Sequence, residues 1–119
     1  MAGAGDVKIP VEEVDPERAA GLLAGGALLI DVRELEEWHA GHAPEAEHLP
    51  LSELVARMGE VPIEHSIVTV CRSGHRSIVA AAALNSSGRT AYSLAGGMLA
   101  WAESGRSLVD GRGESGSVV

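Results

Sequence analysis

Apolar residues along the chain gather in short runs, separated by Gly, Pro and polar residues. The segment 27–32, Ala-Leu-Leu-Ile-Asp-Val, is apolar almost without alternation, which is typical of a strand buried on both faces of a parallel sheet. The segment 67–70, Ile-Val-Thr-Val, consists of β-branched residues and is the clearest predicted strand. Shorter strands are predicted at 7–11, 48–49 and 91–94. Pro10 restricts the first of these to a sheet edge.

Helices are predicted between these strands. Asp15-Pro16 indicates a helix start, with Asp as the N-cap and Pro at the first helical position, and Gly25-Gly26 ends this helix. Further helices are predicted at 34–40, 52–58, 77–85 and 98–103. Because strands and helices alternate with connections of crossover length, the pattern predicts an α/β fold: a parallel sheet with helices on both faces.

The chain has 119 residues, enough for one domain but not for two. We expect this domain to occupy residues 1–109 and the Gly- and Ser-rich segment 110–119 to be a disordered tail. Aromatic residues make up 3% of the chain and Phe is absent, so Ala, Val, Leu and Ile must form most of the core. Trp38 and Trp101 are expected to fill space within it.

Charge and cysteine content narrow the choice of partners and compartment. A net charge of −8 argues against a nucleic acid or an anionic membrane as partner, so an anionic substrate would need a local basic patch. The first ten residues lack the features of a signal peptide, and no apolar run approaches the roughly 18 residues of a membrane span. The single cysteine cannot form an internal disulfide, which favours a reducing compartment. We therefore expect a cytoplasmic protein.

The lone cysteine, Cys71, directly follows the 67–70 strand, and the polar segment 71–77 leads from it into a helix. Ligands of open α/β sheets bind beyond the carboxyl ends of the strands. Unpaired N–H groups at a helix N-terminus, together with two arginines and a histidine in the segment, favour the thiolate. The sequence thus predicts that Cys71 is a nucleophile that needs no separate base. The residues expected to form the loop around its substrate are Arg72, Ser73, Gly74, His75, Arg76 and Ser77.

Three polar side chains elsewhere are candidates for supporting this loop. Asp31 and Arg33 are expected to form an ion pair, which either supports the loop or is an ordinary structural pair. His42 either lines the pocket or caps a turn. The spacing of His39, His42 and His48 matches no zinc-binding pattern, and there is no second cysteine, so neither a metal nor another cofactor is expected.

From about residue 15 to residue 109 the sequence resembles the rhodanese family of sulfurtransferases. The resemblance rests on four segments in the family's order. They are 29–34 (Leu-Ile-Asp-Val-Arg-Glu), 41–46 (Gly-His-Ala-Pro-Glu-Ala) with 49–51, 71–77, and 96–101 (Gly-Gly-Met-Leu-Ala-Trp). At Ala43 and Glu45 the chain departs from the family's usual Ile and Gly, which is expected to alter a turn beside the site.

The resemblance implies a three-layer α/β/α rhodanese-like fold with a five-stranded parallel sheet in the order 1-5-4-2-3. It also implies a persulfide on Cys71, formed when a donor such as thiosulfate gives up its outer sulfur. The acceptor would be cyanide or a thiol, either a small molecule or a protein such as thioredoxin. Arg72 and Arg76 would attract an anionic donor and stabilise the departing sulfite.

Two other functions stay open at this stage. One is a non-enzymatic or partner-dependent sulfur relay module, which hands its sulfur only to a specific protein thiol. The other is a small cysteine phosphatase or arsenate reductase, whose loop is one residue longer than the four residues that separate Cys71 from Arg76. The shorter loop suits a sulfur atom better than a tetrahedral phosphate.

Overall fold

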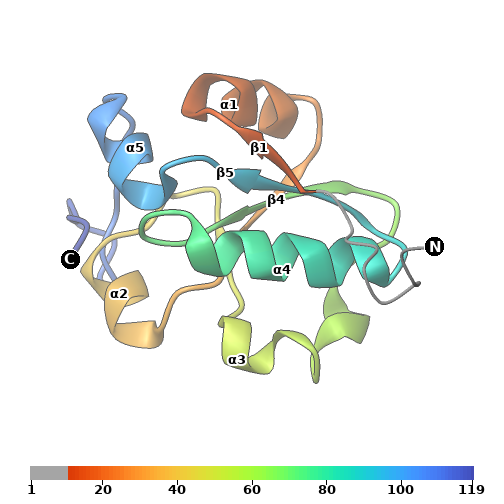
Figure 1. Ribbon diagram of the computed structural model, residues 1–119. Coiled ribbons are helices and arrows are strands. Elements are labelled where there is room, and N and C mark those ends of the chain that lie inside the picture. The colour runs from red at the N-terminus through yellow and green to blue at the C-terminus, as the bar shows by residue number, and fades with distance from the viewer. Residues whose placement is uncertain (1–10) are drawn as a thin grey trace.

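The computed structural model describes residues 11–119, which form a central sheet covered by helices on both sides (Figure 1). The elements are β1 (Glu12–Val14), α1 (Pro16–Ala24), β2 (Leu28–Asp31), α2 (Leu35–Ala40), β3 (Glu47–His48), α3 (Leu51–Leu54), the 3-10 helix η2 (Met58–Glu60), β4 (Ser66–Val70), α4 (His75–Ser86), β5 (Thr90–Leu94) and α5 (Gly97–Glu103). All strand pairs are parallel, and the order is β1-β5-β4-β2-β3. This confirms the predicted α/β fold and its strand order.

Two apolar clusters hold the layers together, one on each face of the sheet. In β4, Ile67 belongs to the cluster beneath α3 and α4, whereas its neighbour Val68 belongs to the cluster beneath α1 and α5. Successive side chains of a strand point to opposite faces, so an unbroken apolar run fills both clusters. Trp101 is 2% exposed and lies in the core as predicted. The same prediction for Trp38 is wrong, because this ring is half-buried on α2.

One predicted element lies almost wholly outside the described residues, and another is clearly shorter in the structure. The predicted strand at 7–11 lies almost wholly outside the described residues, and the first observed strand is β1. The predicted helix at 52–58 is shorter: α3 ends at Leu54, and η2 follows after a turn. Leu54 is buried, and Leu51 and Met58 are partly buried against the same cluster, but Val55 is exposed and the chain turns after Leu54, so that Met58 begins η2.

The segment after α5 folds back along α2. Val109 pairs with His42 in an antiparallel bridge. Further on, the backbone of Ser117 passes so close to Gly41 that a Cβ on the glycine would lie 2.4 Å from the Ser117 carbonyl oxygen. Residues 110–119, expected to be a disordered tail, are thus held against the domain. Most of the contacts between this segment and the domain are backbone hydrogen bonds. Such bonds do not depend on side chains, so the Gly- and Ser-rich composition did not indicate them.

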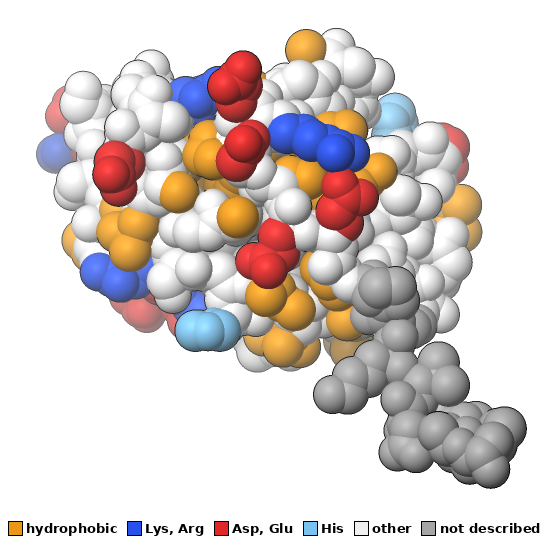
Figure 2. Space-filling view, turned by 45° about the horizontal axis from the view of Figure 1, so that its top comes forward, with side chains coloured by type: hydrophobic (Ala, Val, Ile, Leu, Met, Phe, Trp, Pro, Cys, Tyr) orange, Lys and Arg blue, Asp and Glu red, His pale blue; other side chains and the backbone are white. Residues whose placement is uncertain are grey.

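Acidic side chains outnumber basic ones in the sequence, and many of them lie on the surface (Figure 2). Figure 2 shows acidic side chains spread over one face of the molecule, with basic side chains between them. Within residues 11–119, no helix combines the length and apolar character needed to cross a bilayer.

Candidate active site

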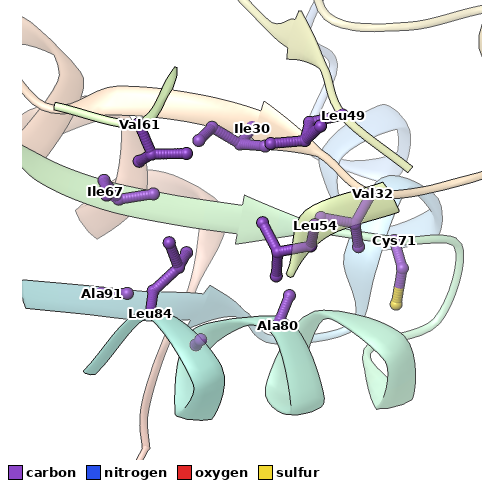
Figure 3. Close-up of a cluster of buried hydrophobic side chains, with 11 residues drawn as sticks. Ile30, Val32, Leu49, Leu54, Val61, Ile67, Cys71, Ala80, Leu84 and Ala91 are labelled. Carbon is purple, nitrogen blue, oxygen red and sulfur yellow. The ribbon is translucent and has the colours of Figure 1, made fainter. Parts of the chain in front are cut away.

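Cys71 lies just beyond the carboxyl end of β4, at the edge of the cluster beneath α3 and α4. Figure 3 shows its sulfur directed towards the loop and first turn of α4. The residue is only 1% exposed, so the thiol sits beneath the loop and not on its surface. The position is the one predicted from the end of the strand, but the burial is greater than a surface loop would give.

The loop wraps its amide groups around the buried sulfur. The backbone N–H groups of Gly74 and Ser77 donate to Cys71 Sγ at 3.1 and 3.4 Å. The Ser77 hydroxyl oxygen lies 3.3 Å from the same sulfur. Gly74 has a φ of +118°, a conformation that favours glycine, and this turns its amide inward. The donors that a thiolate needs are therefore in place.

These donors change the acidity of the thiol. Burial raises the pKa of Cys71, while hydrogen bonds from the Ser77 hydroxyl and from the backbone N–H groups of Ser77, Gly74 and Ser73 lower it. The hydrogen bonds prevail, and the pKa lies below the ordinary value for cysteine. The thiolate, which is the nucleophilic form, is favoured by the geometry of the loop.

A second hydroxyl lies behind the first. Ser93, on the neighbouring strand β5, places its Oγ 2.8 Å from the Oγ of Ser77, and both residues are fully buried. Sequence analysis missed Ser93. A polar residue inside the apolar 91–94 strand could have drawn attention to it. The sequence does not show, however, that its hydroxyl contacts that of Ser77.

Helix α5 holds the loop from the other side. The N–H groups of Met98 and Leu99 donate to the carbonyl oxygens of Cys71 and Arg72 at 2.7 and 3.2 Å. A Cβ at Gly97 would lie 2.4 Å from both carbonyl oxygens, and the φ of this glycine is +59°. In the sequence, Gly97 stood out only as part of the segment 96–101 of the family resemblance; in the structure it permits the close approach of α5 to the loop.

The charged residues of the loop lie at its rim and already have partners. Arg76 forms a two-pronged ion pair with Glu37 of α2, at 2.7 and 2.9 Å. Arg72 donates from Nε to the carbonyl oxygen of Val119 at 2.9 Å. The side chains of Ser73 and His75 are exposed. Glu37 is the second residue that sequence analysis missed.

The three supporting candidates hold the chain around α2. The predicted ion pair between Asp31 and Arg33 is confirmed, with an Nη2 to Oδ2 distance of 2.7 Å and both side chains fully buried. Arg33 also donates to the carbonyl oxygen of Gly41 at 2.8 Å. His42 stacks on Trp38 with ring centroids 3.5 Å apart, and its Nδ1 lies 2.7 Å from the carbonyl oxygen of Trp38. These contacts favour the structural interpretation of all three residues.

Comparison with known proteins shows which family the chain resembles. The rhodanese-like domain family matches residues 15–104. A sulfurtransferase of Allochromatium vinosum is 38% identical over 102 residues, which cover 83% of this chain and 95% of the relative. A thiosulfate sulfurtransferase, GlpE, of Pseudomonas savastanoi pv. phaseolicola is 32% identical over 91 residues, covering 76% of this chain and 86% of the relative.

A solved structure shares the fold. The rhodanese-related protein of Thermoplasma volcanium superposes with a TM-score of 0.77 at 23% identity, covering 82% of this chain and 97% of that one. Together with the two relatives above, the comparisons support sulfur transfer as the class of reaction. The chain belongs to the rhodanese-like family.

Proposed function

We propose that this protein is a sulfurtransferase that carries a sulfane sulfur on Cys71 as a persulfide. Its donor is thiosulfate or a persulfide, and its acceptor is cyanide or a thiol, of a small molecule or of a protein such as thioredoxin. One observation carries the proposal: the only cysteine of the chain is ringed by loop amides and a hydroxyl within 3.4 Å of its sulfur. The single cysteine also favours a reducing compartment, and the cytoplasm is the one we propose.

The chemistry follows from the acidity of the thiol. The Cys71 thiolate attacks the outer sulfur of the donor and forms a new S–S bond, while the donor's own S–S bond breaks. The bonding pair leaves with sulfite when the donor is thiosulfate, so the total charge is unchanged. In the second step an acceptor thiolate attacks the outer sulfur, and Cys71 departs as a thiolate. A thiol with a lowered pKa is the better leaving group in this step.

A partner-dependent relay is the second candidate function. The observation that favours it is the 1% exposure of Cys71, since a buried sulfur is hard for a freely diffusing acceptor to reach. Turnover of thiosulfate with cyanide or a small thiol supports an independent enzyme. Transfer that occurs only to the thiol of a specific protein supports the relay.

Mass spectrometry of the intact protein tests the shared first step. After incubation with thiosulfate or a small persulfide, we expect the mass to rise by about 32 Da, one sulfur atom. The Cys71→Ala variant should gain no sulfur, and its circular dichroism spectrum should match that of the parent protein. Sulfur uptake that persists in Cys71→Ala, or wild-type protein that takes up no sulfur from any donor, would show that the proposed function is wrong.

A further inference from the structure

The ion pair at the rim of the site bears on which donor Cys71 accepts. Arg76 was expected to attract an anionic donor, but its guanidinium group is bound by both carboxylate oxygens of Glu37. Two parallel hydrogen bonds of this kind are the strongest arrangement available to an arginine and a carboxylate. The Glu37 side chain is 18% exposed and that of Arg76 is 35% exposed, so water screens the pair only in part.

Both partners stay charged under ordinary conditions. The hydrogen bonds from Arg76 lower the pKa of Glu37 to about 2, against the opposing effect of burial. The same hydrogen bonds raise the pKa of Arg76 above its usual value, although burial opposes them. The two charges therefore persist together, and their sum at the rim is zero.

Among the arginines near Cys71, only Arg72 keeps a charge that no acidic side chain cancels. Asp31 and Arg33 form a closed, fully buried pair whose net charge is also zero. Arg72 forms no ion pair with an Asp or Glu side chain among the described residues, and its Nε already donates to the main-chain oxygen of Val119. The whole chain carries a net charge of −8, so the long-range field repels anions.

We propose that Glu37 is a specificity-determining residue: by cancelling the charge of Arg76, it makes Cys71 take sulfur from persulfides of small thiols in preference to the thiosulfate dianion. The inference rests on the proposed function. A persulfide of an uncharged thiol carries at most one negative charge, whereas thiosulfate carries two. Because Glu37 cancels one of the two arginine charges of the loop, the site attracts an anion less strongly than two unpaired arginines would, and the loss is larger for the dianion thiosulfate.

Both donors give the same product on Cys71. With a protonated persulfide R–S–SH, the Cys71 thiolate attacks the outer sulfur, the S–S bond breaks, and RS⁻ leaves with the bonding pair. With thiosulfate, sulfite leaves in the same way. The added mass is identical, so the two loading rates can be compared directly in one assay.

The Glu37→Gln variant tests the assignment. Glutamine keeps the Oε1 acceptor that receives the backbone N–H of Glu34 at 3.0 Å, so the start of α2 is preserved. The rate of sulfur loading on Cys71 is measured with thiosulfate and with the persulfide of 2-mercaptoethanol. We expect the thiosulfate-to-persulfide rate ratio to rise roughly three- to tenfold in the variant, as one uncancelled charge at close range predicts. The rise should shrink in high salt.

Two further variants separate a local from a general effect of charge. Glu36→Gln makes the same change in net charge on the same helix. Glu36 is exposed and, among the described residues, forms no ion pair with Arg76, so this variant should leave the ratio unchanged. The double variant Glu37→Gln, Arg76→Gln removes both charges and should return the ratio to the wild-type value.

A ratio that stays unchanged in Glu37→Gln, or that rises equally in Glu36→Gln, would overturn the inference while sulfur uptake still supports the proposed function. Wild-type protein that takes up sulfur from neither donor would instead refute the function itself, and the inference with it.

Discussion

At the scale of single residues, the Ser77 hydroxyl has one proton and three neighbours that can accept it. The carbonyl oxygen of Gly74 lies 3.2 Å away, the Oγ of Ser93 lies 2.8 Å away, and Cys71 Sγ lies 3.3 Å away. A thiolate is the strongest of these acceptors because it is charged. When Cys71 ionises, Ser77 donates to the sulfur, and the Ser93 hydroxyl is free to donate to Ser77. Ser93 thus supports the thiolate through Ser77.

Replacing these hydroxyls should raise the pKa of the Cys71 thiol. Ser77→Ala removes a hydrogen bond to the charged sulfur, so the pKa should rise. Ser93 acts on the sulfur only through Ser77, so Ser93→Ala should give a smaller rise. Because the thiolate is the reactive form, the pH profile of alkylation by iodoacetamide should move to higher pH in both variants. Ser86→Ala, at the exposed end of α4, should leave the profile in place. A profile unmoved by Ser93→Ala would mean that this hydroxyl has no part in stabilising the thiolate.

The site residues that could be predicted from the sequence have their partners nearby in the chain. Those that could not be predicted have their partners far away in the chain. Cys71 and its loop are local: a strand, a polar turn and a helix follow one another, and their geometry is implied by that order. Glu37 meets Arg76 across 39 positions, and Ser93 meets Ser77 across 16 positions. Neither residue type nor spacing indicates such contacts, which depend on how the strands are ordered in the sheet.

At the scale of elements, the start of α5 lies against the carbonyl groups of the loop around Cys71. This contact keeps the loop's carbonyls directed at α5 while the amides of Gly74 and Ser77 face the sulfur. Apart from the strand expected at 7–11, which lies almost wholly outside the described residues, the strands and most of the helices predicted from the sequence are in the right places. The helix expected at 52–58 is an exception: Leu54 and Met58 both pack on the core, but local propensity does not show that the chain turns between them.

Gly97→Ala should separate α5 from the loop. Its Cβ would lie 2.4 Å from two carbonyl oxygens at a φ of +59°, so the backbone must shift, and we expect a loss of about 2 kcal/mol or more in the free energy of unfolding. The pKa of Cys71 should rise as well, because the loop amides lose their fixed orientation. Urea denaturation and the pH profile of alkylation measure the two effects.

Gly105→Ala is the matched control for this substitution. Its φ of +86° is also positive, but nothing lies within 4 Å of the added Cβ. Only the cost of the backbone conformation should appear, about 1 kcal/mol, with no change in the pKa of Cys71. If both variants change the alkylation profile equally, the close contact of α5 with the loop does not set the acidity of the thiol.

At the scale of the whole molecule, the segment after α5 returns to the loop around Cys71. The carbonyl oxygen of Val119 receives a hydrogen bond from Arg72, 47 positions earlier in the chain. Gly41 and Gly116 permit this return, because a Cβ on Gly116 would lie 2.7 Å from the Cα of Gly41. The segment 41–46 was singled out for its resemblance to a family signature, whereas the segment that packs on it carried no signal beyond small residues.

Gly116→Ala should release residues 115–119 from the domain without unfolding it. The added methyl group would meet the backbone near Gly41, while both apolar clusters keep almost all of their members. We expect the amide of Ser117, which donates to the carbonyl oxygen of Ala40 at 2.9 Å, to lose its protection in hydrogen exchange, with little change in the melting temperature. Ser117→Ala leaves that backbone bond intact and should keep the protection. If the Ser117 amide stays protected in Gly116→Ala, the backbone contact with Gly41 does not hold residues 115–119. If the melting temperature of this variant drops strongly, residues 115–119 are part of the cooperative core.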